Sequence, residues 1–308
     1  RAVLEFYKPR LRIPKINNKI KKFFTLFFPG IIGSGVIQLN IIIGTIIASF
    51  LPVGAISHIY YADRLNQLPL AIFGIALGVV LLPRLSKAIK QNNQTDINII
   101  QNRSLEFSLL IALPSAVGLY VLAYPIIHIL FERGAFVLED TFFTANVLSY
   151  FALGLPAYII IKILVTCFFA REDTKTPLYV SIISVLTNII LSLILIQSMR
   201  EIGIALATAI SAWLNAFLLY IVLNIRNNIT LDSQLISNSI KTIICSIVMG
   251  CVCYFLNLIF FLHITMHSAI YNAGMLILVI MICKTVYIAV IFMLKVLTID
   301  ELKRYIRK

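Results

Sequence analysis

A long apolar run headed by an acid and a base constrains the fold of this chain most strongly. Residues 60–87 read YYADRLNQLPLAIFGIALGVVLLPRLSK, in which Asp63 and Arg64 precede apolar residues that continue to Leu82. A helix rises about 1.5 Å per residue and the bilayer core is about 30 Å thick, so this run is typical of a membrane span. An arginine near the centre of a span costs about 2.5–3.5 kcal/mol or more, and such a charge normally faces protein or water. The alternative is that Arg64 reaches the nearer lipid headgroups along its aliphatic stem.

The composition is typical of a polytopic membrane protein. Hydrophobic residues make up 60% of the 308 residues and charged residues only 13%, with a mean hydropathy of +0.96. A soluble chain of this length needs far more polar surface. The five cysteines lie in apolar runs without a CxxC pair, which favours neither a disulfide framework nor a zinc site. We therefore predict an all-α membrane protein with no metal site and no cofactor.

The apolar runs predict eight transmembrane helices, joined by short polar connections. Residues 84–104 are polar and basic and favour an interfacial helix and loop. Residues 131–140, FERGAFVLED, are expected to be turn-like. The predicted spans cover about 23–50, 56–82, 105–124, 141–170, 178–197, 202–225, 242–262 and 269–294.

The distribution of positive charge tests this topology. Placing the N-terminus in the cytoplasm puts 21 of the 26 Lys and Arg residues on the cytoplasmic side and only Arg133 and Arg200 outside. The remaining three, Arg64, Lys162 and Lys284, fall within predicted spans. Cytoplasmic connections of membrane proteins carry such an excess of Lys and Arg. Both ends of the chain are thus predicted to be cytoplasmic, and the net charge of +13 needs no nucleic-acid partner.

The sequence contains no pattern that predicts catalysis. It has no Walker A motif, and its histidines lack metal-ligand spacing, which favours interfacial positions near the span ends: His58, His128, His263 and His267. Proline lies inside several predicted spans, and charged residues lie within two of the best defined ones. Proline-interrupted helices with buried charge indicate a transporter whose helices rock or bend, and not an enzyme.

Several segments together resemble the MurJ/MviN family of lipid II flippases, within the larger superfamily of drug, oligosaccharide and lipid exporters. Residues 60–87 are similar to the signature helix of that family. The resemblance covers essentially the whole chain and weakens after about residue 230. Its other segments follow in the expected order: ALPSAVGL (112–119), FERGAF (131–136), FFAREDTKTP (168–177) and GIALATAISAWLNAFLLY (203–220).

The resemblance implies fourteen transmembrane helices, arranged as two six-helix lobes and a C-terminal pair. Residues 1–22 would be a basic cytoplasmic linker, and residues 23–225 the second six-helix lobe. Residues 226–308 would hold a polar connection, a helix pair that forms a groove for a lipid tail, and a basic cytoplasmic tail. We expect the first lobe to be missing from this chain and to be its partner in the bacterial inner membrane.

The implied substrate is lipid II, the undecaprenyl-pyrophosphate-linked disaccharide pentapeptide, flipped from the cytoplasmic to the periplasmic leaflet. The arginine of the family's ADRL motif lines the central cavity and maps onto Arg64, whose fork of donors suits phosphate oxygens. Asp63 is expected to orient or pack beside it. Lys162 lies where relatives also tend to carry a lysine and is a candidate substrate contact, the alternative being a structural role or a reach to the interface.

The sequence departs from the family at one ion site. Some members bind sodium through carboxylates on the seventh and eleventh helices, and these positions correspond to Gly44 and Ser192 here. Asn188 and Thr208 remain as neutral ligands. Hard cations usually require an anionic oxygen, so sodium coupling through this site is doubtful, whereas coupling to membrane potential or to protons stays open.

Two alternatives to lipid II transport stay open at this point. One is a related exporter of another polyprenyl-linked glycan or of an amphiphile. The other is an inactive truncated scaffold that recruits partners.

Overall fold

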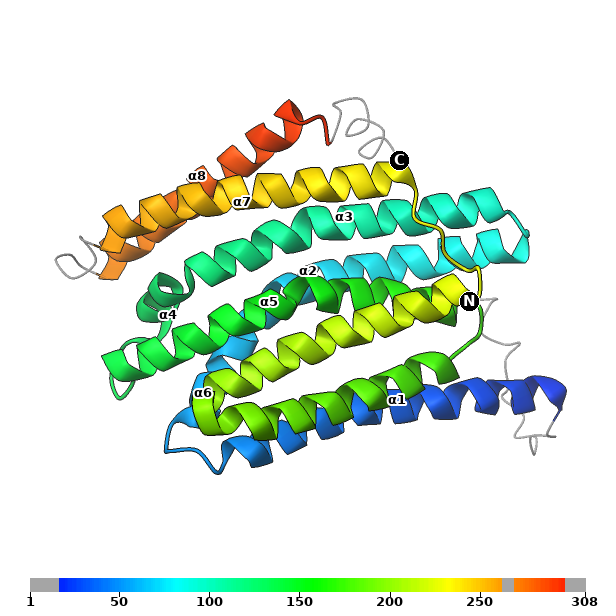
Figure 1. Ribbon diagram of the computed structural model, residues 1–308, viewed down its shortest axis with the longest axis horizontal. Coiled ribbons are helices and arrows are strands. Elements are labelled where there is room, and N and C mark those ends of the chain that lie inside the picture. The colour runs from blue at the N-terminus through cyan, green and yellow to red at the C-terminus, as the bar shows by residue number, and fades with distance from the viewer. Residues whose placement is uncertain (1–16, 262–268, 297–308) are drawn as a thin grey trace, which may run out of the picture.

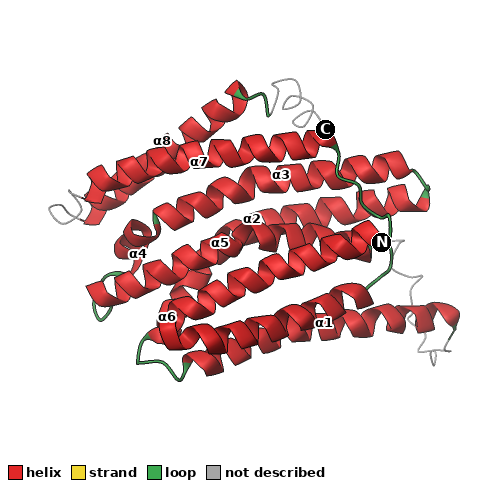
Figure 2. Cartoon of the chain, viewed as in Figure 1, coloured by secondary structure: helices red, strands yellow, loops and turns green. Residues whose placement is uncertain are grey.

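The structure is a computed structural model that describes residues 17–261 and 269–296, without the side chains at 19, 22, 34, 37, 72–79, 260, 261 and 269. The described residues form eight α-helices and no strand (Figures 1 and 2). Six of these helices are long and apolar enough to cross a membrane, so the protein is a polytopic all-α membrane protein. The helices are α1 (Asn18–Ala48), α2 (Ala55–Lys90), α3 (Gln94–Val121), α4 (Ala123–Phe131), α5 (Leu138–Phe169), α6 (Lys175–Ile225), α7 (Ser233–Phe261) and α8 (Ala269–Met293).

Helix α5 lies at the centre of the bundle. It packs against α2, α3, α4 and α6, while α1 packs on α6, α7 on α3, and α8 on α7 (Figure 1). Small residues allow the closest of these approaches, because a Cβ on Gly154 would lie only 3.0 Å from the Ala209 Cα of α6. In lipid, helix association depends on such close packing more than on a hydrophobic driving force.

Helix α6 is a helical hairpin and contains both of the spans predicted at 178–197 and 202–225. Its backbone leaves helical geometry at Arg200, where φ is 52° and ψ is −135°. Figure 1 shows the two halves running side by side in opposite directions from this bend. Gly203 permits the tight return, because a Cβ there would lie 2.6 Å from the Leu195 carbonyl oxygen.

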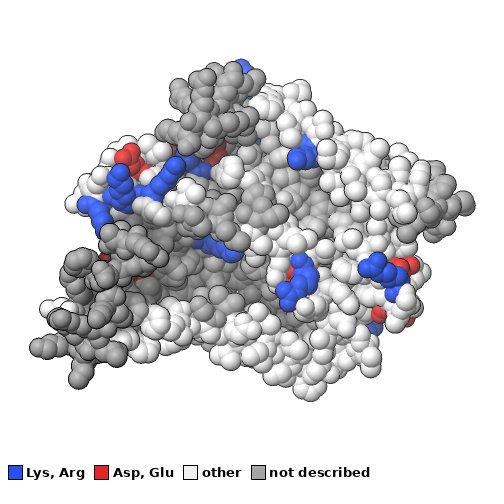
Figure 3. All heavy atoms as spheres, turned by 180° about the vertical axis from the view of Figure 1, so that it is seen from behind, with Lys and Arg blue, Asp and Glu red and all other residues white. Residues whose placement is uncertain are grey.

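The connections between helices lie at two ends of the bundle, and these ends differ in charge. The α2–α3 turn, the α5–α6 loop and the α6–α7 link lie together at one end of the bundle (Figure 1). The α1–α2 loop, the α4–α5 loop and the α6 bend lie at the other end. Seen from behind, many of the Lys and Arg side chains gather towards the first end, on the left of Figure 3. We call this the basic end and the other the outer end.

Two details differ from the sequence-based expectation. Helix α2 continues through Pro69 and Pro83 to Lys90, and α3 begins at Gln94. Residues 84–104 therefore hold the end of α2, a short turn and the start of α3, where an interfacial helix and loop were expected. The nine-residue helix α4 was not predicted, because the third span was expected to end near residue 124 and residues 131–140 to be turn-like. The count of eight spans stays a prediction.

Candidate substrate-facing site

One face of α2 carries Arg64 and is left open by the rest of the fold. Five side chains at spacings of three and four residues are exposed along this helix, and we call them the α2 stripe: Ser57, Tyr60, Arg64, Leu68 and Ala71. Residues at this spacing share one helical face. Because these side chains are exposed, no other described helix covers the stripe. The face of α2 that carries Arg64 is therefore available to a ligand or to a further part of the protein.

Arg64 is held by an aromatic ring and not by a carboxylate. Its guanidinium carbon lies 4.6 Å from the centroid of the Tyr60 ring, within cation–π distance. Asp63 is half-buried, and its carboxylate accepts a hydrogen bond from the Gln67 amide one turn later. Within the described residues, Arg64 forms no ion pair. Its edge N–H groups are thus free to donate to an anion.

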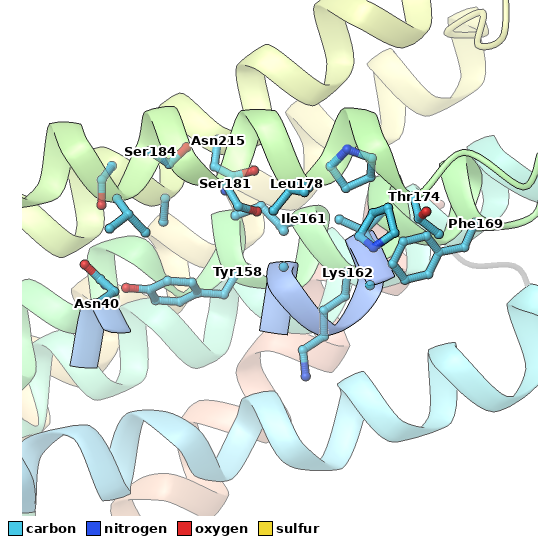
Figure 4. Close-up of a pocket in the computed structure, with 18 of the residues that line it drawn as sticks. Asn40, Tyr158, Ile161, Lys162, Phe169, Thr174, Leu178, Ser181, Ser184 and Asn215 are labelled. Atoms are coloured by element: carbon cyan, nitrogen blue, oxygen red, sulfur yellow. The ribbon is translucent and has the colours of Figure 1, made fainter. Parts of the chain in front are cut away.

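A cavity of about 480 Å³ lies between α1, α2, α5 and α6 and contains the other predicted cation. Asn40, Tyr158 and Lys162 contribute to its wall (Figure 4). Leu70 of α2 also lines it. Figure 4 shows the Lys162 side chain directed away from Ser181, Ser184 and Asn215, which lie on the α6 side. Lys162 is exposed and, among the described residues, pairs with no carboxylate.

The structure separates Arg64 and Asp63 from this cavity. Neither residue contributes to its wall, whereas Leu70, six residues later on α2, does. A helix rises about 1.5 Å per residue, so Arg64 lies about 9 Å along the axis from Leu70. The three predicted residues therefore belong to two neighbouring places, with Arg64 and Asp63 on α2 and Lys162 in the cavity wall.

The positions that correspond to the family's ion site form a neutral polar cluster between α1 and α6. The Asn188 amide donates to Asn40 Oδ1 at 2.9 Å, and the Ser192 hydroxyl donates to Asn188 Oδ1 at 3.3 Å. Thr208 lies 3.5 Å from the same Asn188 oxygen. These described side chains satisfy one another without a carboxylate. The doubt about sodium coupling at this site stays a prediction.

An apolar groove of about 400 Å³ lies on another side of the bundle. It is formed by residues of α3, α5, α6 and α7, including Leu164, Trp213 and Ile240. The Trp213 indole is anchored by donating to the Leu153 carbonyl at 3.0 Å. Residues of α8 do not line this groove. A groove between α7 and α8 themselves, as expected for a lipid tail, stays a prediction.

The sequence did not predict a cluster of charged residues around a buried histidine at the outer end. His58 at the start of α2 is hydrogen-bonded to Asp140 of α5 and Glu201 of α6, and both His58 and Glu201 are buried. His58 lies near a helix end, as expected, but it is enclosed by protein. The available signal was that residues 58, 140 and 201 each lie beside the start of a predicted span on the same side of the membrane.

At the basic end, hydrogen bonds to charged groups fix the connections. Arg103 pairs with Glu106 and with Asp232, which ties α3 to the α6–α7 link. Asp173, in the α5–α6 loop, accepts hydrogen bonds from the Thr176 backbone and hydroxyl and from Arg226. Burial alone would raise the pKa of Asp173, but these hydrogen bonds and the Arg226 charge together hold it below its ordinary value. Burial lowers the pKa of Arg171 in the same loop.

Comparison with solved structures defines the class of protein. An outward-facing multidrug resistance transporter of the MATE family, within the MOP superfamily, matches with a TM-score of 0.60 over 88% of this chain and 64% of its own, at 16% identity. At this identity the likeness shows the fold alone. The structure of "Lipid II flippase MurJ, inward closed conformation" matches with a TM-score of 0.67 at 30% identity, over 89% of this chain and 56% of its own. The fold is thus one that this chain shares with a lipid II flippase and with a MATE transporter.

Sequence comparison then gives the family. A sequence model described as lipid II flippase MurJ matches residues 3–274. The probable lipid II flippase MurJ of Rhizobium tropici is 38% identical over 299 residues, which are 97% of this chain and 56% of that protein. The corresponding protein of Rickettsia prowazekii (strain Madrid E) is 36% identical over 92% of this chain and 55% of its own length. The chain belongs to the MurJ family, which confirms the resemblance, and it spans little more than half the length of these relatives.

Proposed function

We propose that the protein containing this chain flips lipid II from the cytoplasmic to the periplasmic leaflet by alternating access. It acts as a transporter and not as a catalyst. Membership of the MurJ family supports the substrate, since the relatives are named as lipid II flippases. The observation that carries the proposal is the exposed side chain of Arg64, which forms no ion pair among the described residues and lies on a face of α2 that no other described helix covers.

The chemistry of Arg64 suits the pyrophosphate of this substrate. A guanidinium presents donors in a planar fork that matches two phosphate oxygens at once. A cavity that excludes water strengthens this contact, because charges interact more strongly at low dielectric. Tyr60 lies on one face of the fork and leaves its edge open. In this proposal Arg64 makes the principal contact with the pyrophosphate.

Asp63 and Lys162 take supporting roles in the proposal. The Gln67 amide holds the Asp63 carboxylate, so Asp63 keeps the local helix geometry and does not neutralise Arg64. Lys162 adds a second positive charge in the cavity wall. A flexible ammonium group serves as a point charge for phosphate oxygens as the lipid head group moves. Lys162 lines the same cavity as Leu70 of α2, the helix that carries Arg64, which supports a contact on the same route.

The open α2 stripe is proposed to face the first lobe across the transport cavity. An arginine left facing lipid is costly, so the first lobe or water must cover it in the working protein. Side chains of α1 are also widely exposed, among them Phe28, Ile32 and Ile41. Membrane lipids and the first lobe are therefore the expected partners, and no nucleic acid is involved.

The proposed orientation places the basic end in the cytoplasm and the protein in the bacterial inner membrane. The described residues at and near this end include Arg103, Arg171, Lys175 and Arg226, whereas Arg133 and Arg200 lie at the outer end. The bias of Lys and Arg towards cytoplasmic connections supports this assignment. Both ends of the chain are then cytoplasmic.

Complementation of a bacterium depleted of its lipid II flippase tests the proposal. The complete protein should restore growth, and Arg64→Ala should fail to do so while reaching the membrane at the wild-type level. Arg133→Ala, which removes an exposed arginine from the outer loop, is the matched control and should rescue. Failure of the wild-type protein would favour another polyprenyl-linked glycan or an amphiphile as the substrate. Normal growth with Arg64→Ala would contradict the role of Arg64.

A further inference from the structure

Three helices at the outer end meet at one histidine. His58 Nε2 lies 2.9 Å from Asp140 Oδ1 of α5, and His58 Nδ1 lies 3.2 Å from Glu201 Oε1 of α6. The His58 residue is 4% exposed and Glu201 is fully buried. The histidine therefore joins the start of α2 to the start of α5 and to the second half of α6, and each ring nitrogen faces a carboxylate oxygen.

The groups around this histidine are defined on every side that packs against it. From α5, the Phe143 ring stacks on the imidazole with a centroid distance of 5.7 Å. From α6, Arg200 Nε lies 3.4 Å from Glu201 Oε2, and the Arg200 guanidinium lies over the same Phe143 ring. From the α1–α2 loop, Gly54 lies so close that a Cβ there would be 3.3 Å from the imidazole.

Glu132 and His128, which are close to this cluster in the chain order of the outer end, form a separate pair. Glu132 accepts hydrogen bonds from His128 Nδ1 and from the Thr141 hydroxyl, both at 2.6 Å. The charged groups that bear directly on His58 are therefore Asp140, Glu201 and, through Glu201, Arg200.

This geometry requires an additional proton. A neutral imidazole carries one N–H, and its other nitrogen presents a lone pair. That lone pair would face a carboxylate oxygen at hydrogen-bond distance, which is repulsive. Two donating N–H groups remove the conflict, and they make His58 an imidazolium. Carboxyl groups ordinarily release their proton at a much lower pH than imidazole, so the proton belongs on the ring.

We propose that His58, Asp140 and Glu201 form a proton-binding site that holds α2 against α5 and α6 at the outer end. With the proton bound, His58 and Arg200 balance the two carboxylates. Without it, the cluster carries an uncompensated negative charge around the fully buried Glu201, and an unpaired charge is costly to bury. Loss of the proton therefore loosens the start of α2, the helix that carries Arg64. The proposal concerns helix packing and does not depend on the identity of the substrate.

Histidine-selective ¹⁵N NMR of the full protein tests the protonation directly. A variant in which the other three histidines of this chain are replaced by glutamine (His128→Gln, His263→Gln and His267→Gln) leaves His58 as the one histidine that this chain contributes to the spectrum. Difference spectra between the wild type and His58→Gln give the same assignment if that variant does not fold. We expect both ring nitrogens of His58 to carry a proton at neutral pH. A ring with one protonated nitrogen at neutral pH overturns the proposal.

The consequence for packing is tested by thermal unfolding of the detergent-solubilised protein at increasing pH. Stability from the bound proton is present at low pH and is lost as the pH rises. The apparent melting temperature of the wild type should fall above neutral pH, and His58→Gln should show less than half of this fall. His128→Gln is the matched control, because its ring faces one carboxylate only, and it should keep the wild-type fall. A fall as steep in His58→Gln as in the wild type overturns the proposal, and Asp140→Asn provides the same test if His58→Gln does not fold.

Discussion

The guanidinium carbon of Arg64 lies 4.6 Å from the centroid of the Tyr60 ring, one helical turn earlier on the same exposed face of α2. An aromatic ring restrains an arginine without consuming the hydrogen-bond donors at the edge of its guanidinium. A carboxylate in the same place would neutralise the charge and occupy those donors. The pair thus orients a cation that forms no ion pair among the described residues, on an exposed face of α2.

Replacing Tyr60 should weaken the substrate contact moderately. A cation–π contact at an exposed site contributes about 0.5–1 kcal/mol, so Tyr60→Leu should lower the apparent affinity for lipid II about two- to fivefold. Tyr60→Phe keeps the ring and should behave almost as the wild type. Binding of lipid II to the purified protein measures both variants. Equal losses for Leu and Phe would show that the hydroxyl, and not the ring, matters.

A lysine at position 64 should restore only part of the activity that arginine gives. A lysine keeps the positive charge but offers a point contact where the guanidinium offers a planar fork. Arg64→Lys should therefore support less transport than the wild type and more than Arg64→Ala. Growth rate in the flippase-depleted strain, at matched membrane levels, ranks the three proteins. Full activity of Arg64→Lys would indicate that charge alone is sufficient.

Adding one methyl group at the α6 bend should destabilise the protein. A Cβ at Gly203 would lie 2.6 Å from the Leu195 carbonyl oxygen, so the backbone must shift to admit it. Such overpacking costs about 1–3 kcal/mol. Gly203→Ala should lower the apparent melting temperature, while Gly118→Ala, with no atom within 4 Å of the new Cβ, should not. Equal melting temperatures for the two variants would argue against the tight hairpin.

The α5–α6 loop should lose stability in acid through Asp173. The pKa of Asp173 in the folded protein lies below the ordinary 3.8. Its contribution is therefore complete above that value and is lost as the pH falls towards the folded-state pKa. Asp173→Asn should be less stable than the wild type at neutral pH and should lose less stability in acid. Thermal unfolding as a function of pH measures this, with Glu139→Gln as a control that should retain the wild-type acid dependence.

The long apolar helices and the basic end were predictable because they depend on local sequence. Runs of about twenty apolar residues give the helices, and the distribution of Lys and Arg gives the ends. The α6 hairpin was predicted as two spans, since Arg200 and Glu201 interrupt the apolar run. Helix α4 was missed because the third span was expected to end near residue 124, whereas α3 ends at Val121 and α4 begins at Ala123 after one non-helical residue.

The placement of individual side chains depended on contacts between distant residues. The ADRL motif indicated Arg64, but only the structure shows that Tyr60 restrains it and that Gln67 binds Asp63. Lys162 and Arg64 were grouped by charge, whereas the fold places them apart. The His58 cluster joins residues separated by 82 and 143 positions in the chain, so no local pattern reports it.

The most direct test of the account is the appearance of lipid II in the outer leaflet of cells whose only flippase is this protein. The wild type and Arg133→Ala should expose lipid II to an external probe, whereas Arg64→Ala should retain it in the inner leaflet at equal membrane levels. Outer-leaflet lipid II at the wild-type amount in Arg64→Ala cells would contradict the assignment of Arg64 as the principal contact with the pyrophosphate.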